Sequence, residues 1–266
     1  MFSVYTKQAK NAAAANCPGM SKNATVSWQP PSTLEIRYTS NIGGDLETLP
    51  YLATVIKNCR EEHPDMLLFD TGSFSGPNRP GPHKGEPHVK VYNYLKYTAV
   101  VPGRAEAMDT SALKKMARAA EFPFVATNWK GMGEGDFFVH SKVLDAKNGD
   151  KIVILGMAPV DTVPKDTELI PTMEALDAAL KDYEPADTVV VILSQLDGNQ
   201  NLAMANHGKF TKIIISGILV PGADQTMKIS NSLLAPATDG PHNLGSLTVN
   251  LGGAIKVNKK KSENPE

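Results

Sequence analysis

The chain has 266 residues, of which 41% are hydrophobic and 21% charged, and its formal net charge is −1. A chain of this size and apolar content can bury a sizeable core within one domain. The near-neutral charge supplies no field that would hold nucleic acid or an anionic membrane surface, and no run approaches the ~18 apolar residues of a membrane span.

Residues 1–32 are rich in Ala, Asn, Ser and Pro and have no sustained period, which predicts an irregular lead-in segment. Polar and apolar residues then alternate over 34–38, as in a strand with one buried face. Between 46 and 62 the apolar residues recur at steps of three and four. This spacing predicts an amphipathic helix, which the prolyl sequence at 63–65 ends.

A continuous apolar run over 66–70 predicts a strand that is covered on both faces. Helical and strand-like patterns alternate after it. We expect helices at 88–96, 110–120, 172–182 and 198–207, and strands at 98–101, 122–127, 151–156, 187–193 and 212–216. This alternation predicts an α/β layered sandwich with parallel strands at its centre.

The chain is expected to finish in β structure, because the strand-like runs at 232–235 and 245–251 have no helical pattern between them. A turn at 252–253 then completes a hairpin-like arrangement, and residues 258–266 form a basic, flexible tail. The stretch 72–85 is too rich in glycine and proline for a helix or a central strand. We expect it to be a loop at the carboxyl end of a strand, where open α/β sheets build their sites.

The two cysteines, Cys17 and Cys59, have the spacing of no zinc or haem motif. A disulfide between them is one alternative if the protein is exported, and we expect a free pair instead. The common signatures of nucleophilic hydrolases, P-loop and dinucleotide-binding proteins and zinc proteases are also missing. The sequence therefore predicts no cofactor.

The order of the segments carries a resemblance. The sequence IRYTSNIGGDLE at 36–47 stands where one family has a strand followed by T-N-D-x-H-G-x-L, and LLFDTGSFSG at 67–76 stands where that family has L-L-D-A-G-D-x-x-x-G. KGEP at 84–87 and NYLKYTAV at 93–100 match its K-G-E-P and N-x-L-G-Y-D-A-V. In this order the segments resemble the calcineurin-like metallophosphoesterases, in particular the 5′-nucleotidase and UDP-sugar hydrolase branch. The resemblance implies a four-layer αββα sandwich with mixed sheets over residues 33–257.

That family hydrolyses phosphate esters with two metal ions, which need carboxylate and imidazole ligands at loop ends. In this chain the matching positions hold other residues, namely Asn41, Gly43, Ser73, Arg104, Ala105, Gln195, Ile218 and Val220. Gly, Ala, Ile and Val have no side-chain donor, and an arginine places a permanent cation where two dications would bind. The resemblance thus implies that the metal site is lost and that no metal is bound.

Four of these residues, Asn41, Ser73, Arg104 and Gln195, are candidates for binding a polar or anionic ligand. The guanidinium of Arg104 could hold an anion, but we favour an internal ion pair with Glu106 or Asp70. The other three side chains could equally satisfy one another.

Two further groups near the 72–85 loop have structural interpretations. We expect Asp70 to bond with Ser73 and Ser75 and so to cap the loop. We expect His83 and His88 to be solvated rather than to form a new metal site, because no carboxylate pattern supports them.

These observations favour a non-catalytic bacterial protein that serves as a subunit, adaptor or scaffold in a larger protein assembly, on the periplasmic or extracellular side. The lead-in and the 72–85 loop are the expected contact surfaces for a protein partner. Two alternatives stay open: a small-molecule protein that binds an anion or nucleotide in the vacated cleft, and a residual phosphoesterase with relocated metals. We expect no nucleic-acid partner.

Overall fold

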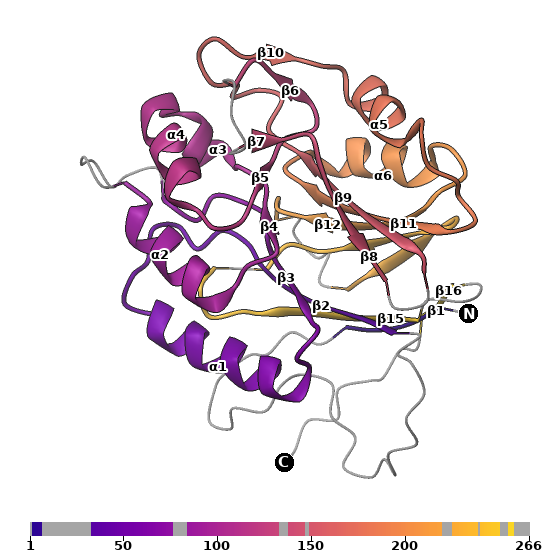
Figure 1. Ribbon diagram of the computed structural model, residues 1–266, viewed down its shortest axis with the longest axis horizontal. Coiled ribbons are helices and arrows are strands. Elements are labelled where there is room, and N and C mark those ends of the chain that lie inside the picture. The colour runs from indigo at the N-terminus through magenta and orange to yellow at the C-terminus, as the bar shows by residue number, and fades with distance from the viewer. Residues whose placement is uncertain are drawn as a thin grey trace.

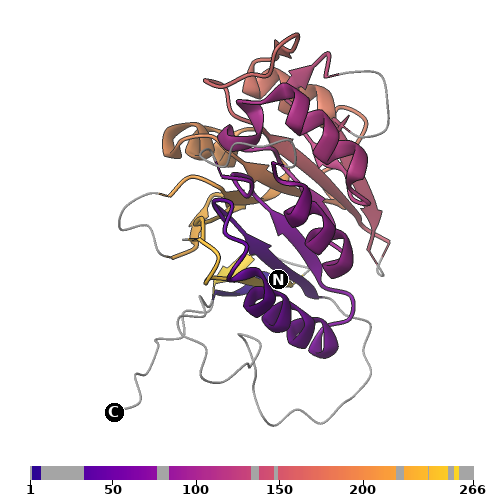
Figure 2. The same ribbon diagram turned by 90° about the vertical axis from the view of Figure 1, so that its left-hand side faces the viewer.

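The computed structural model describes residues 2–6, 33–76, 84–132, 138–146, 149–219, 225–238, 240–250 and 255–257, with only the backbone of the first and last of these ranges. Two mixed β-sheets pack face to face between two layers of helices, as Figure 1 and Figure 2 show from two directions. This arrangement confirms the predicted four-layer αββα sandwich.

The first sheet has the strand order β16-β1-β15-β2-β3-β4-β5-β7, and β2 to β5 are its parallel centre. Its strands are β1 (Phe2–Thr6), β2 (Thr33–Thr39), β3 (Leu67–Asp70), β4 (Ala99–Val100), β5 (Phe124–Val125), β7 (Phe138–Val139), β15 (Gly245–Asn250) and β16 (Ile255–Val257). Three helices cover its outer face: α1 (Leu49–Glu62), α2 (Glu86–Leu95) and α4 (Thr110–Ala119). A single helical turn, α3 (Arg104–Ala107), follows β4.

The second sheet has the order β13-β14-β12-β11-β9-β8, with four parallel strands between two antiparallel edge strands. Its strands are β8 (Ser141–Asp145), β9 (Lys151–Met157), β11 (Thr188–Ser194), β12 (Thr211–Ser216), β13 (Met227–Ile229) and β14 (Ser232–Ala235). Helices α5 (Thr172–Leu180) and α6 (Gly198–Asn206) cover its outer face. A short ribbon of β6 (Trp129–Lys130) and β10 (Glu168–Leu169) lies apart from both sheets.

The central strand β11 shows why the apolar runs are continuous. All seven of its residues are buried. Val191 and Leu193 belong to the core between the sheets, whereas Val190 and Ile192 pack toward α5 and α6. Since both faces are covered, successive residues enter different cores, and only the end residues Thr188 and Ser194 are polar. The sequence pattern therefore predicted this strand correctly.

Two of the helices, α4 and α6, begin where an aspartate side chain accepts from a backbone N–H group. Asp109 accepts from the N–H of Ala112 at 2.9 Å at the start of α4, and Asp197 accepts from the N–H of Gln200 at 2.8 Å at the start of α6. Such caps contribute about 1 kcal/mol each and fix the first residue of the helix.

The two sheets approach each other backbone to backbone at β5 and β9. Thr127 N–H donates to the carbonyl of Gly156 at 2.7 Å, and the N–H of Gly156 donates back to Oγ1 of Thr127 at 3.0 Å. A Cβ on Gly156 would lie 2.0 Å from the carbonyl oxygen of Val125. Only glycine therefore permits this contact.

The prediction of a hairpin-like finish is wrong. β14 and β15 lie in different sheets: β14 pairs with β12 and β13, while β15 pairs with β1 and β2. The hairpin partner of β14 is β13, which has three residues and so shows no measurable alternation. The expected turn at 252–253 and the basic tail at 258–266 lie outside the described residues.

The lead-in segment contains one strand that the sequence did not predict. β1 pairs antiparallel with β15, and Val4 stands opposite Val249. Residues 7–32, with Cys17, lie outside the part of the chain that the structure describes. Cys59 is buried on α1 and is disulfide-bonded, so the expectation of free cysteines is wrong. Among the helices described, none has the length and apolarity needed to cross a membrane.

Candidate functional site at the strand ends

The parallel strands of both sheets end at one shared edge of the sandwich, and the positions matched to metal ligands follow these ends. Asn41 comes after β2, Ser73 after β3 and Arg104 after β4 in the first sheet. Gln195 comes after β11 and Ile218 after β12 in the second. Val220 lies outside the described residues.

Two side-chain amides tie the two sheets together at this edge. Nδ2 of Asn41, in the first sheet, donates to the carbonyl of Gly217 in the second at 3.0 Å. Nε2 of Gln195, in the second sheet, donates to the carbonyl of Thr71 in the first. The amides therefore bond to backbone carbonyls across the sandwich, and not to each other as one alternative from the sequence had it.

The loops at the edge are in direct backbone contact. A Cβ on Gly217 would lie 2.4 Å from the carbonyl oxygen of Thr71, and a Cβ on Gly103 would lie 2.2 Å from the backbone nitrogen of Ser73. Gly72 has a φ of +91°, and a Cβ there would lie 2.6 Å from the nitrogen of Gly103. No further side-chain atom fits between these segments, since contacts below 3.0 Å do not occur without a shift of the backbone.

Glu106 lies on the single helical turn α3 and is fully buried. Its carboxylate accepts from the N–H groups of Gly103 at 2.9 Å, Ser73 at 2.8 Å and Ser75 at 2.8 Å, and from the Ser75 hydroxyl at 2.6 Å. Four donors use most of the acceptor capacity of a carboxylate. Glu106 thus fixes the 73–75 loop against α3.

Asp70, at the end of β3, is buried with different partners from those predicted. It accepts from Thr39 Oγ1 at 2.5 Å, from the Tyr92 hydroxyl at 2.8 Å and from the N–H of Gly72 at 2.7 Å. The expected bonds to the two serines of the loop are absent, because those serines donate to Glu106 instead. Burial raises the pKa of Asp70 to about 7, against the opposing effect of the three hydrogen bonds.

Two stacked tyrosines complete the surroundings of Asp70, and sequence reasoning did not find them. The rings of Tyr92 and Tyr97 lie 3.9 Å apart between centroids, and the hydroxyls of Tyr97 and Thr39 are 3.0 Å apart. Burial raises the pKa of both phenols well above the usual value. The tyrosines therefore remain neutral donors beside the carboxyl group.

Arg104 forms an ion pair with Asp161, which follows β9 in the second sheet. The predicted partners, Glu106 and Asp70, are buried and already bonded to other donors, whereas 56% of the Arg104 side chain is exposed. An exposed pair of this kind is worth at most about 1 kcal/mol. Arg104 thus lies over the edge, and the buried neighbour Ala105 faces the interior.

His88 is buried and not solvated as predicted. Its Nε2 lies 3.2 Å from the carbonyl oxygen of Asp45, and its ring packs at 6.0 Å from that of Phe74. His83 lies outside the described residues.

The donor set at this edge does not fit a pair of divalent cations. No group of three or more His, Cys, Asp or Glu side chains within the described ranges is placed to hold a metal ion. The nearest carboxylates, Asp70 and Glu106, are bonded to protein donors, and the amides of Asn41 and Gln195 direct their N–H groups at carbonyls. Divalent metals in such sites require several free carboxylate oxygens or imidazole nitrogens.

The architecture defines a class: an αββα sandwich whose parallel strands from both sheets end at one edge. The chain has the fold of the calcineurin-like metallophosphoesterases and 5′-nucleotidases. A 5′-nucleotidase precursor from Thermus thermophilus superposes with a TM-score of 0.67 at 17% identity, over 81% of this chain and 51% of that one. The sulfate thiohydrolase SoxB of the same organism gives 0.62 at 11% identity, over 83% and 53%. YfkN, a calcineurin-like phosphoesterase from Bacillus subtilis, gives 0.56 at 18% identity, over 84% and 92%.

This chain spans about half the length of the first two proteins. No family model matches the sequence. No curated protein matches it either. At 11% to 18% identity the likeness concerns the fold, and the chemistry has to be argued from the residues of this chain.

Proposed function

We propose that this chain is a non-catalytic metallophosphoesterase-like protein that serves as a subunit, adaptor or scaffold in a larger protein assembly. One observation carries the proposal: side-chain amides and backbone contacts join the two sheets at the edge where the family places its metals. The chain keeps the metallophosphoesterase-like fold, while side chains at positions matched to metal ligands make internal contacts.

The geometry of the edge supports this proposal energetically. A two-metal site needs ions about 3.5–4 Å apart, with ligands around each. Making room for them would break the bonds from Asn41 to Gly217 and from Gln195 to Thr71, each worth about 1 kcal/mol, and would separate backbones now in contact. No carboxylate or imidazole group among the described residues is positioned to repay this cost.

The disulfide at Cys59 supports the proposed location on the periplasmic or extracellular side. Disulfides persist in oxidising compartments and are rare in the cytosol of most organisms. An exported protein with a complete core and without metal ligands is well suited to a binding role, because a protein partner would contact its surface.

Metal content and turnover test the first half of the proposal. The protein is incubated with excess Mn²⁺, desalted and analysed by elemental mass spectrometry, and hydrolysis of bis-p-nitrophenyl phosphate and of AMP is measured in parallel with an active metallophosphoesterase. We expect no stoichiometric metal and no turnover above the buffer rate. Bound metal together with turnover that chelation abolishes would refute the proposal in favour of a residual phosphoesterase.

Association tests the second half. The tagged protein is purified from its native extract under mild conditions and its mass is measured by light scattering, next to the same protein made in a foreign host. We expect a defined larger complex only from the native source. A monodisperse monomer from both sources would count against a subunit or scaffold role.

The vacated-cleft alternative has a separate test, because Arg104 is already paired with Asp161. Thermal shifts with AMP and with inorganic phosphate are compared between the wild type and Arg104→Ala. A shift that requires Arg104 would favour a small-molecule binder.

A further inference from the structure

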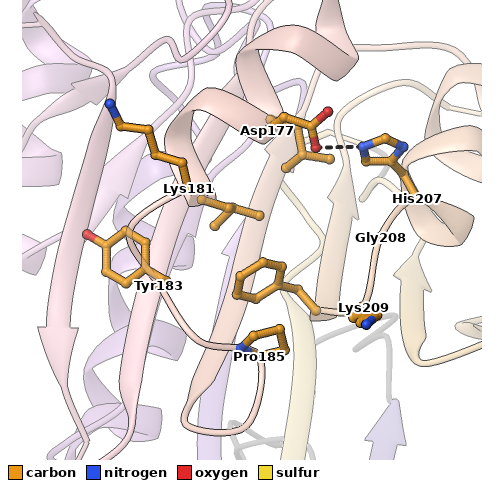
Figure 3. Close-up of a pocket in the computed structure, with 10 residues that line it drawn as sticks. Asp177, Lys181, Tyr183, Pro185, His207, Gly208 and Lys209 are labelled. Atoms are coloured by element: carbon orange, nitrogen blue, oxygen red, sulfur yellow. Dashed lines mark hydrogen bonds and ion pairs between the residues drawn. The ribbon is translucent and has the colours of Figure 1, made fainter.

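A depression of about 320 Å³ lies on the outer helical layer of the second sheet, between the last turns of α5 and α6 (Figure 3). The turns that line it lead into β11 and β12, at Thr188 and Thr211, so it lies where these strands begin. The candidate site described above lies where the same strands end. The two sites are therefore at opposite edges of the sheet.

The floor of the depression is apolar and aromatic. Leu176 and Leu180 are buried, and Phe210 and Tyr183 are half-buried against the same core. Pro185 completes the wall. A depression lined by such residues favours a ligand with an aromatic ring, because aromatic rings pair through offset or edge-to-face contacts. The volume is at the lower end of the range for ligand pockets, about 300–1,000 Å³, which suits a ligand with one ring.

Three charged side chains and His207 stand around this floor, and some of them have structural tasks. Lys181 is the C-cap residue of α5, where a cation offsets the negative end of a helix, and His207 is the C-cap residue of α6. His207 also bonds to Asp177 at 2.7 Å, which engages the one acidic residue of the lining (Figure 3).

Lys209 has no such task. It lies beyond the end of α6, is exposed, and has no hydrogen-bond or ion-pair partner in the described part of the chain. The Tyr183 hydroxyl likewise has no hydrogen-bond partner there, and it lies on the opposite side of the depression from Lys209 (Figure 3). The acidic residues of the α5–β11 turn, Asp182, Glu184 and Asp187, do not line the depression. Lys181 is exposed too and has no hydrogen-bond or ion-pair partner among the described residues, so the unpaired groups at the rim are Lys181, Lys209 and the Tyr183 hydroxyl, all of which can donate.

We propose that this depression binds a small aromatic carboxylate, whose ring covers the Leu180 and Phe210 floor and whose carboxylate pairs with Lys209. The ring replaces water over an apolar surface, and the carboxylate meets a cation that no other group of the described chain neutralises. The proposal is independent of the proposed function, since it uses no residue of the strand-end edge.

The probe for the test is 3-phenylpropanoate, with the uncharged 3-phenylpropanamide as its matched comparison. Binding is followed in ¹H–¹⁵N correlation spectra of the full chain. We expect saturable shifts centred on 207–210 and 180–185, with a Kd of about 1–5 mM for a ligand of this size. The amide should bind about fivefold more weakly, which is the size of one rim ion contact.

The variants are Lys209→Glu and its control Lys90→Glu. Both lysines are exposed, and Lys90 is on α2, over the other sheet, so the two proteins have the same net charge. Lys209→Glu should weaken 3-phenylpropanoate at least fivefold and leave 3-phenylpropanamide unchanged within twofold, while Lys90→Glu should change neither. Phe210→Leu keeps the floor apolar and should weaken both ligands by removing the ring contact.

Three results would overturn the proposal. The first is the absence of saturable shifts in the wild type at these segments. The second is equal affinity for the acid and the amide, and the third is equal weakening by Lys209→Glu and Lys90→Glu. Unchanged unfolding midpoints of the two lysine variants, measured in urea, exclude loss of structure as the cause of any change.

Discussion

The buried carboxyl group of Asp70 makes the stability of this protein depend on pH in a defined direction. Its pKa is about 7 in the folded chain, against 3.8 for the ordinary side chain. The folded state therefore keeps a proton that the unfolded state releases between these values. The contribution of this proton to the free energy of unfolding is fully present below about pH 4 and is lost as the pH rises to about 7.

Replacement of Asp70 by asparagine removes this dependence. Asparagine stays neutral, and its amide oxygen can accept from the hydroxyls of Thr39 and Tyr92 as the Asp70 oxygen does. The two pKa values differ by about 3.2 (7 − 3.8), and 1.36 kcal/mol per pKa unit gives about 4 kcal/mol over the full range. From about pH 5 to pH 8 we expect the free energy of unfolding of Asp70→Asn to rise by about 3 kcal/mol relative to the wild type.

Urea denaturation at several values between about pH 5 and pH 8 measures this difference. Tyr92 and Tyr97 do not titrate there, because burial raises the pKa of both phenols. The matched control is Asp182→Asn, which removes an exposed carboxylate and should give a curve parallel to the wild type. A constant offset between Asp70→Asn and the wild type across this range would show that Asp70 does not titrate within it, and the reasoning would fail.

Three further predictions concern stability and are checked in the same urea assay. Gly156→Ala should destabilise the protein by about 3 kcal/mol, because the added Cβ would lie 2.0 Å from a carbonyl oxygen. The control Gly198→Ala, with open space around it, should be within about 1 kcal/mol of the wild type. Equal effects of the two substitutions would contradict the close approach of the sheets. Gln195→Ala should lower the free energy of unfolding by about 1–3 kcal/mol, because the hydrogen bond to the buried Thr71 carbonyl is lost, and the metal content should not change. A gain in bound Mn²⁺ would contradict the structural role of this hydrogen bond. Reduction of the Cys59 disulfide should lower the free energy of unfolding by about 2–4 kcal/mol, and denatured, unreduced protein should take up no thiol label; labelling before reduction would show that the bond is absent.

The sequence predicted most of the buried elements, because a strand that is buried on both faces has a continuous run of apolar residues. β11 is apolar from Val189 to Leu193 and β3 from Leu67 to Phe69, so each strand was found within one or two residues. The pairing of one strand with another has no comparable pattern in the sequence. β13 and β1 have three and five residues, and the sheet that β15 joins is decided by contacts with β2, more than 200 positions away in the chain.

The sequence predicted where the residues of the candidate site lie, but it did not predict their hydrogen-bond and ion-pair partners. The order of the strands placed Asn41, Ser73 and Gln195 at one edge, since parallel strands end together. Their bonds run to backbone carbonyls, which are present at every residue and so give no signal in a sequence. Arg104 shows the same limit: Asp161, its partner, is 57 positions away, and nothing local distinguishes it from the carboxylates nearer in the chain.

Side chains satisfy backbone groups at the edge of the sandwich where the parallel strands end. Buried carbonyls that stay unpaired are costly. Here the amides of Asn41 and Gln195 satisfy carbonyls of the opposite sheet, and Glu106 satisfies four donors of the adjoining loop. A side-chain amide supplies the N–H donors that a carboxylate lacks. Asn41 and Gln195 therefore make contacts that an aspartate or glutamate at the same position could not make.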